Sequence, residues 1–397
     1  MDDGREDRRT APTPERATAV STSEAKVVHF CTNVGGGVFG EGQVAAWREC
    51  GLDARLHYAV ELADYWRAKS GMLSKLRLRW VMYLHYPRML RQAVRAARPG
   101  EVFVAVTNPF FAPALAAREA RRSGARIVHL VYDLYPDALV FGGGWSPGHP
   151  AARFAASTTR AAIRNCAATV YLGERLRAHA EAQYGAAKRT AVIAVGTDAS
   201  VFADHMPELR NPGSVHCLYS GHMGRLHDWE TLAGALAEGI SSGCTVEIAA
   251  DGPGARQLKD ALRGVSGSES ARLRFAGTRG NAEWRAAMLA ADVALVTMCP
   301  GAEKVVMPSK TYSAMAAGQA ILAVCPRNSD LADTVLRHDC GWIVEPGDAG
   351  DLRHRLAAFT ADRGELLRKR RNAYTAAHSQ YSMRATAQDW KTLLGSL

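Results

Sequence analysis

The sequence GAEKVVMPSKTYSAMAAG, residues 301–318, joins two apolar strand-like runs at 293–298 and 321–324. Its first half places Glu303, Pro308, Ser309 and Lys310 in a loop, and its second half starts a helix of small residues. Such a loop lies outside the carboxyl ends of parallel strands, where open α/β sheets bind ligands. Lys310, at the first turn of the helix, would offer an ammonium group beside free backbone N–H groups. The stretch therefore predicts a site for a phosphate-bearing ligand.

Apolar strand-like runs and helical patterns alternate through the rest of the chain, which indicates an α/β fold. The predicted strands are 26–32, 102–107, 126–132, 168–172 and 191–195, followed by 215–219, 245–249, 273–276, 293–297 and 321–324. Residues 197–213 interrupt the alternation with a stretch that contains Pro and Asn, which is typical of an interdomain linker. The sequence predicts two Rossmann-like domains, each a doubly wound parallel sheet, at 26–196 and 214–379. We expect the C-terminal helix, 380–397, to pack back on the first domain.

Composition limits the class of protein. The chain has 397 residues, 47% of them hydrophobic and 22% charged, as expected for a soluble two-domain protein of enzyme size. Residues 1–25 are polar, mixed in charge and lack the apolar core of a signal peptide, so we predict a disordered leader. The eight cysteines occur singly, without a metal-ligand spacing, which predicts reduced thiols in a cytoplasmic protein and no metal site.

The net charge of +10 is concentrated in one segment. Residues 65–98 hold nine Lys or Arg and no acidic residue, and they include a Leu and Trp stripe near one helical face, at positions 73, 76, 80, 84 and 90. One interpretation is a peripheral contact with anionic lipid, or a site for a lipid-linked or phosphorylated acceptor, near Arg77 and Arg79. The other is a surface helix whose apolar stripe packs on the sheet. Nucleic acid is not a predicted partner, because no nucleic-acid motif accompanies this segment.

A glycine-rich turn follows the first predicted strand. Asn33 to Gly40, NVGGGVFG, lies between that strand and a helical pattern, and Gly36 and Gly37 would let the backbone approach a ligand closely. The turn has neither the G-x-G-x-x-G spacing of a dinucleotide site nor the Lys of a P-loop. It could therefore border a ligand or merely tighten a strand-to-helix connection.

Four turns of the second half lie at one edge of its predicted sheet. They carry Gly224 and Arg225 in SGHMGR (220–225), Asp251 in ADGPG (250–254), Arg279 in GTR (277–279), and Lys310. Because the carboxyl ends of parallel strands share an edge, we expect these groups to converge on one crevice. Arginine and lysine at that place suit a phosphate group.

At this point the sequence resembles the retaining GT-B glycosyltransferases of family 4, and within them the N-acetylfucosaminyltransferase-like branch. The resemblance runs from about Lys26 to the C-terminus and depends on four segments in this order: LYSGHMGRLHDWETL (218–232), IAADGPG (248–254), ADVALVTM with the stretch 301–318 after it, and CGWIVEPGD (340–348).

This resemblance implies that the C-terminal domain holds a UDP-sugar, the N-terminal domain holds the acceptor, and no metal or other cofactor is needed. Arg225 and Lys310 would neutralise the donor diphosphate, Glu303 would contact sugar hydroxyls, and Asp133 would lie beside the reacting carbon. The other implied contacts with the donor are Gly36, Gly37, Gly224, Asp251, Arg279, Pro308, Ser309 and Ser313. Asn108 would face the acceptor, which is either a lipid-linked glycan precursor or a small natural-product intermediate.

The sequence departs from the family at one place. Family members typically carry two glutamates separated by seven residues, and the corresponding positions here are Val305 and Ser313, with Glu303 two residues early. Two functions follow. One is a metal-independent retaining transferase that moves an N-acetylhexosamine or related hexose from a UDP-sugar to a hydroxyl group, in the cytoplasm or at the inner face of the membrane. The other is a catalytically impaired GT-B protein that supports another glycosyltransferase.

Overall fold

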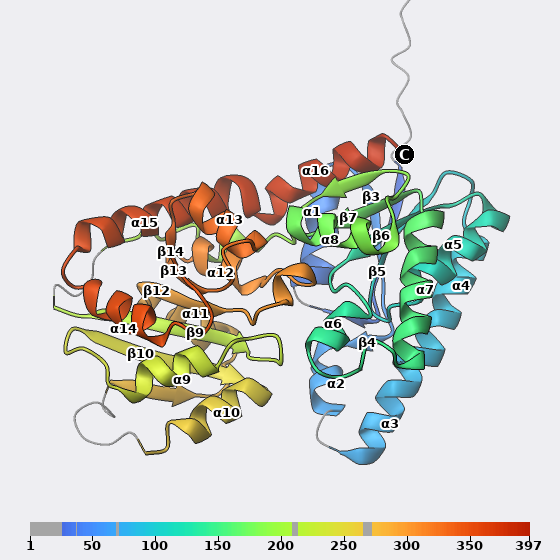
Figure 1. Ribbon diagram of the computed structural model, residues 1–397. Coiled ribbons are helices and arrows are strands. Elements are labelled where there is room, and N and C mark those ends of the chain that lie inside the picture. The colour runs from blue at the N-terminus through green and yellow to red at the C-terminus, as the bar shows by residue number, and fades with distance from the viewer. Residues whose placement is uncertain (1–25, 37, 69–70, 209–212, 265–271) are drawn as a thin grey trace, which may run out of the picture.

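Two α/β domains lie side by side in the computed structural model of the chain (Figure 1). The structure describes residues 26–36, 38–68, 71–208, 213–264 and 272–397. The predicted leader 1–25, Gly37, and parts of the predicted linker and of the basic segment lie outside these ranges.

The N-terminal domain contains a six-stranded parallel sheet. Its strand order is β3-β1-β5-β6-β7-β8, with β1 Val27–Cys31, β3 Asp53–His57, β5 Val102–Val106, β6 Arg126–Val131, β7 Ala168–Tyr171 and β8 Thr190–Val192. Every residue of β5 is buried, as expected for a central parallel strand with helices on both faces. Two short strands form a separate two-stranded sheet: β2 Val34–Gly35, which follows β1 along the chain, and β4 Val60–Glu61, which follows β3.

Helices cover both faces of this sheet. On one face α4 Tyr86–Ala96 and α5 Ala112–Ser123 pack against the Phe103 side, with α7 Pro150–Asn165 beside α5 (Figure 1). On the other face Trp47 of α1 Gln43–Glu49 packs edge-on against Phe30, with ring centroids 5.6 Å apart. The remaining helical segments are η1 Val38–Gly42, α2 Leu62–Arg67, α3 Met72–Trp80, η3 Val81–His85, α6 Asp137–Phe141 and α8 Glu174–Tyr184.

The C-terminal domain repeats the architecture. Its parallel sheet has the order β11-β10-β9-β12-β13-β14, with β9 Val215–His222, β10 Cys244–Asp251, β11 Leu273–Ala276, β12 Val293–Thr297, β13 Ala320–Val324 and β14 Gly341–Val344. Its helices are α9 Glu230–Ala237, α10 Pro253–Ala261, α11 Asn281–Ala290, α12 Lys310–Ala316, α13 Asp330–Arg337, α14 Ala349–Ala358 and α15 Arg363–Ala376. Short segments η4 Ala199–Phe202, η6 Ala302–Lys304 and η7 Ala377–Tyr381 complete the fold.

The last helix, α16 Met383–Gly395, returns to the N-terminal domain (Figure 1). Trp390 packs on Trp47 of α1, with ring centroids 5.1 Å apart. Lys26 Nζ donates to the carbonyl oxygens of Leu394 and Leu397, at 2.8 Å each. The chain therefore crosses between the domains twice, near residue 197 and again before α16.

The predicted fold class of two Rossmann-like parallel-sheet domains is confirmed. One interpretation of the basic segment is wrong for most of its length. Leu90 is buried as expected for a stripe that packs on the sheet, but the side chains at 73, 76, 80 and 84 are exposed. The reason is that α3 extends below the sheet instead of lying across it (Figure 1).

Candidate functional site

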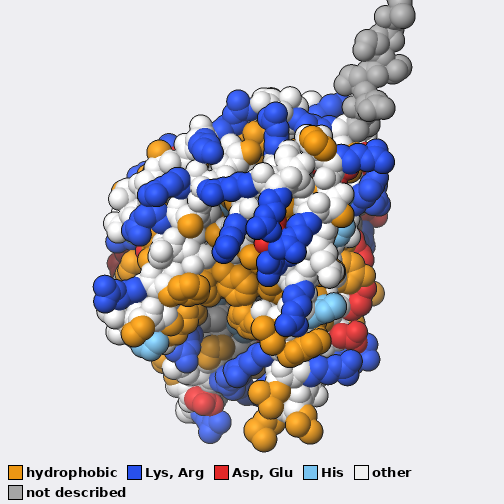
Figure 2. Space-filling view, turned by 90° about the vertical axis from the view of Figure 1, so that its right-hand side faces the viewer, with side chains coloured by type: hydrophobic (Ala, Val, Ile, Leu, Met, Phe, Trp, Pro, Cys, Tyr) orange, Lys and Arg blue, Asp and Glu red, His pale blue; other side chains and the backbone are white. Residues whose placement is uncertain are grey.

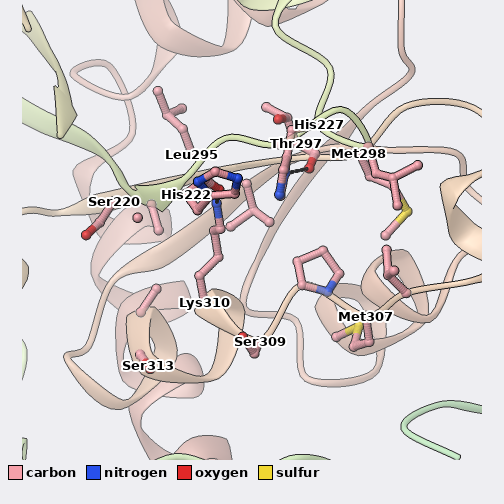
Figure 3. Close-up of a pocket in the computed structure, with 18 of the residues that line it drawn as sticks. Ser220, His222, His227, Leu295, Thr297, Met298, Met307, Ser309, Lys310 and Ser313 are labelled. Carbon is pink, nitrogen blue, oxygen red and sulfur yellow. Dashed lines mark hydrogen bonds between the residues drawn. The ribbon is translucent and has the colours of Figure 1, made fainter. Parts of the chain in front are cut away.

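A cavity of about 510 Å³ opens at the carboxyl edge of the C-terminal sheet and faces the N-terminal domain. The turns after β9 and β12 and the start of α12 form most of its wall (Figure 3). Among the described residues, only Phe39 and Asp133 contribute to it from the N-terminal domain. Turn packing fixes this wall: Gly252, at φ +106°, lies so close to Met223 that a Cβ there would stand 2.5 Å from its carbonyl oxygen.

Lys310 is the first residue of α12 and extends into the cavity toward His222 (Figure 3). Its Nζ donates to the Tyr219 hydroxyl at 2.8 Å and to the His222 carbonyl oxygen at 2.9 Å. It also lies 4.2 Å from the centre of the Tyr219 ring. Burial lowers the pKa of Lys310 to about 7, and the charge of Asp251 opposes that shift. An anion in the cavity would raise this pKa again, so Lys310 is suited to bind one.

Arg225 supplies a second cation from the turn after β9. It lines the cavity together with Gly224, and its Nη1 lies 3.4 Å from the carbonyl oxygen of Gly142, which ends α6 in the other domain. The guanidinium therefore spans the space between the domains. The structure thus brings Arg225 and Lys310 to one cavity, as the sequence predicts. Their contact with a ligand stays a prediction.

Asp133 faces these cations from the N-terminal domain. It follows β6, and its backbone N–H donates to Thr107 Oγ1 at 3.3 Å. Burial raises the pKa of Asp133 to about 6, so the group is a carboxylate at neutral pH and a weaker acid than usual. The next residue, Leu134, donates its N–H to the carbonyl oxygen of Val305 at 3.3 Å, which ties this turn to the C-terminal domain.

His227 lines the cavity, and Tyr219 lies behind its wall as a hydrogen-bond partner of Lys310. Neither was among the site residues predicted from the sequence. His227 Nδ1 lies 2.8 Å from the carbonyl oxygen of Thr297, which can only accept, so Nδ1 carries the proton. Burial, with a smaller contribution from Lys310, lowers the pKa of His227 to about 3. The ring is therefore neutral and its Nε2 can accept a hydrogen bond. The available signal was their position within the apolar strand β9 and shortly after it, on the way to the predicted cavity edge.

The loop before α12 supplies Pro308 and Ser309 to the same cavity, and α12 itself supplies Ser313. Ser313 Oγ lies 3.0 Å from Thr197 Oγ1, at the place where the chain crosses between the domains. The deeper part of the cavity is apolar and is lined by Trp284, Met288 and Ala314.

Three predicted donor contacts of the C-terminal domain do not line this cavity. Glu303 is buried in η6, where its carboxylate accepts from the N–H of Gly301 at 2.6 Å. Arg279 folds back to pair with Glu247 of β10. Asp251 accepts from His222 Nδ1 at 2.7 Å and borders a separate hollow beside α10. The structure gives these side chains local partners, and their contact with a donor stays a prediction.

Apart from Asp133, the predicted site residues of the N-terminal domain that the structure describes do not line the cavity either, neither the donor contact Gly36 nor the acceptor contacts. Gly36 has φ +86° and packs near Leu62 of α2, while the predicted Gly37 lies outside the described residues. Asn108 is exposed, and its Oδ1 accepts from Asn33 Nδ2 at 3.0 Å. Arg77 and Arg79 lie on α3. Their proposed contact with an acceptor is not tested by this arrangement.

Comparison with known proteins gives one curated relative. No family model matches the chain. A probable glycosyltransferase of Pseudomonas aeruginosa, WbjE, is 26% identical over 259 residues. The matched region spans 64% of this chain and 64% of that relative.

Solved structures match over more of the chain. HepE of Anabaena, in complex with UDP, has a TM-score of 0.69 and 16% identity, over 94% of this chain and 100% of that one. WaaG, a glycosyltransferase involved in lipopolysaccharide biosynthesis, has a TM-score of 0.64 and 13% identity, over 92% of this chain and 99% of that one. These likenesses show the fold, and the predicted GT-B arrangement of two facing Rossmann-like domains is confirmed.

Proposed function

We propose that this chain is a metal-independent retaining glycosyltransferase that moves a sugar from a UDP-sugar to a hydroxyl acceptor. The observation that carries the proposal is the pair of cations, Arg225 and Lys310, in one cavity with the Asp133 carboxylate on the opposite wall. The similar fold of HepE, which was solved with UDP and with UDP-glucose, supports a UDP-sugar as donor. An N-acetylhexosamine or a related hexose is the proposed sugar.

The two cations would act on the leaving group. As the glycosidic bond to the diphosphate breaks, negative charge develops on the phosphate oxygens. A guanidinium and an ammonium group therefore stabilise the transition state more strongly than they stabilise the bound donor. Proton uptake by Lys310 on donor binding follows from its lowered pKa. Among the described residues, no group of three His, Cys, Asp or Glu side chains could hold a metal ion. Metal independence itself stays a proposal, to be tested with a chelator.

Asp133 would act on the sugar. The transition state of glycosyl transfer is oxocarbenium-like, and a carboxylate beside the reacting carbon stabilises its positive charge. Retention would follow from attack on the face that the diphosphate leaves, with the departing phosphate taking the acceptor proton. His227 Nε2, a neutral acceptor at the cavity wall, would bind a sugar hydroxyl.

The acceptor is proposed as a lipid-linked glycan precursor or a small natural-product intermediate, with Asn108 near its hydroxyl group. We place the reaction in the cytoplasm or at the inner face of the membrane, with residues 65–98 as the membrane contact in the second case. Among the described residues, no helix has the length and apolar character to cross a bilayer.

The second candidate function is a GT-B protein without turnover that supports another glycosyltransferase. The observation that favours it is Ser313, whose hydroxyl is bonded to Thr197 where the resemblance expects a glutamate. Slow hydrolysis of a UDP-sugar by the purified chain separates the two functions. Hydrolysis supports the transferase, whereas UDP binding without hydrolysis or transfer favours the partner protein.

Donor binding is tested by thermal unfolding in the presence of UDP-, GDP- and TDP-sugars, with and without EDTA. We expect UDP-sugars to raise the melting temperature most and EDTA to leave that rise unchanged. Lys310→Ala and Arg225→Ala should each weaken UDP about 10- to 100-fold, since a charge-assisted hydrogen bond contributes roughly 1.5–3 kcal/mol. Lys391→Ala, an exposed lysine of α16, is the matched control and should bind UDP normally. A strict metal requirement, or no response to any UDP-sugar, would contradict the proposal.

A further inference from the structure

The helix α3 and the segment η3 that follows it expose a row of large apolar side chains. None of the nine residues of α3, all of which the structure describes, is buried. Met72 and Leu73 are 80% and 81% exposed, and Leu76 and Trp80 are each more than half exposed. Tyr83 and Leu84 extend the row into η3 at 47% each. We call these six side chains the α3 ridge. A contiguous exposed apolar surface of this kind marks a place where something binds.

Cations surround the α3 ridge. Residues 65–98 contain no acidic side chain, and none of the ion pairs in the described part of the chain involves Arg77, Arg79 or Arg88. Farther along the same face, Arg91 and Arg95 share the carboxylate of Glu119. Figure 2 shows this face of the molecule, with hydrophobic side chains at its lower end and across its middle, and Lys and Arg around them. The occupant of the ridge should therefore be apolar in its interior and negatively charged at its surface.

An aromatic cluster leads from the ridge toward the cavity. Tyr83 lies against Phe111, Phe111 against Phe110, and Phe110 against Tyr135, with ring centroids 6.4, 5.5 and 5.8 Å apart. Tyr135 is two residues from Asp133, and burial, with a smaller contribution from the charge of Asp133, raises the pKa of that tyrosine. Phe154 of α7, 62% exposed, lies 6.2 Å from Phe110 and widens the apolar surface. An amphiphile held at the ridge would thus have an apolar path to the carboxylate.

We propose that the α3 ridge docks the protein on an anionic bilayer, with its apolar side chains in the headgroup and acyl boundary and the neighbouring arginines on lipid phosphates. A helix that exposes Leu, Met and Trp beside Arg and Lys lies in the plane of such an interface. Each Lys or Arg near an anionic leaflet strengthens the attraction. The choice of acceptor rests on the proposed function. Docking at a bilayer favours the lipid-linked class of acceptor, because the aromatic cluster runs from the bilayer to Asp133.

Vesicle binding tests the ridge without reference to catalysis. The full chain is sedimented with phosphatidylcholine vesicles that do or do not contain phosphatidylglycerol. We expect binding only with phosphatidylglycerol, and weaker binding as salt is added. Leu73→Ser with Leu76→Ser, and separately Arg77→Gln with Arg79→Gln, should each lower the partition coefficient at least about tenfold. Leu336→Ser, which changes a 61% exposed leucine of α13, is the matched control and should bind like the wild type.

Quenching by lipids brominated in the acyl chain tests insertion as distinct from charge attraction alone. Tryptophan fluorescence should fall on binding, and Trp80→Phe should remove much of that fall while vesicle binding persists. Equal binding by the Leu73→Ser, Leu76→Ser variant overturns the proposal. The proposal is also overturned if the wild-type chain does not bind anionic vesicles but forms a dimer that this variant abolishes, because the ridge would then be a protein interface.

The thermal response to UDP keeps the two proposals separate. Both double variants should keep the wild-type rise in melting temperature with UDP, which also shows that they are folded. A chain that responds to UDP but does not bind anionic vesicles overturns the docking proposal alone. Vesicle binding without any response to UDP overturns the proposed function alone.

Discussion

Lys310 and Asp133 face one cavity, and the proposed reaction needs Lys310 protonated and Asp133 deprotonated. Burial raises the pKa of Asp133 to about 6 and lowers that of Lys310 to about 7. Asp133 acts as a carboxylate, so activity should rise as the pH rises through about 6. Lys310 acts as an ammonium group, so activity should fall as the pH rises through about 7. We therefore predict a bell-shaped profile of kcat/KM for the UDP-sugar, which reports the free enzyme.

Two variants assign the limbs of this profile. Lys310→Arg keeps its charge at all these pH values and should remove the fall above pH 7. Asp133→Asn should lower activity and flatten the rise below pH 6. Initial rates at low donor concentration across the pH range provide the measurement. An alkaline limb that is the same in Lys310→Arg and in the wild type would show that another group titrates there.

Lys310 could be located from the sequence because it stands at the start of a helix at the carboxyl edge of the predicted sheet. Lys310 reaches its contacts because α12 starts directly after the loop that follows β12, next to β9 in the sheet. Glu303 and Arg279 were assigned to the donor on position alone. Their partners, Gly301 N–H and Glu247, depend on how η6 curls and on which way the chain leaves β11. Composition and spacing contain no signal for those directions.

At the scale of elements, the central strands were predictable, whereas two edge strands, β3 and β14, were not among the predicted ones. β12 and β13 bury every residue and stand out as apolar runs. β3, with the sequence DARLH, pairs only with β1 at the edge of its sheet and buries only Ala54, so it carries too few apolar residues to be recognised. The stripe on 73–84 has helical spacing whether it meets the sheet or a bilayer. Periodicity finds the face of a helix, but it does not say what covers that face.

The contact between α13 and α8 joins the two domains. The Asp330 carboxylate accepts from the backbone N–H groups of Arg175 and Leu176, at 3.0 and 3.1 Å, at the start of α8. A Cβ on Gly173 would come within 2.2 Å of this carboxylate, so glycine is required for the close approach. A buried carboxylate at a helix N-terminus satisfies free N–H groups and opposes the helix dipole. This contact therefore holds the domains in register.

We predict that Asp330→Asn lowers the free energy of unfolding by about 1–2 kcal/mol, because the charge at the start of α8 and one of its hydrogen bonds are lost. Asp333→Asn is the matched control. It breaks only the more exposed pair with Arg175, at 2.9 Å, and should cost less than about 1 kcal/mol. Urea unfolding of both variants measures the difference. Equal losses in the two would show that the buried contact contributes no more than the surface pair.

At the scale of the whole molecule, the cavity and the α3 ridge are separate sites that one experiment can map. Nearly all of the cavity wall belongs to the C-terminal domain, and the ridge belongs to the N-terminal domain. UDP should slow amide hydrogen exchange in the turns at 220–228 and 306–313, and in the N-terminal domain only near Phe39 and Asp133. Anionic vesicles should instead slow exchange in 72–84. The reason is that local protection follows the segment whose opening a ligand disfavours.

The two footprints should not overlap, and each has its own control. UDP with Lys310→Ala should leave 220–228 and 306–313 unprotected while vesicles still protect 72–84. In the Leu73→Ser, Leu76→Ser variant, vesicles should leave 72–84 unprotected while UDP still protects 220–228 and 306–313. If UDP alone protects 72–84, the ridge and the cavity are coupled through the aromatic cluster at Tyr83 and Tyr135, and docking would then change donor affinity as well. If vesicles protect 220–228 in the absence of UDP, the C-terminal domain itself contacts the bilayer and the proposed orientation is wrong.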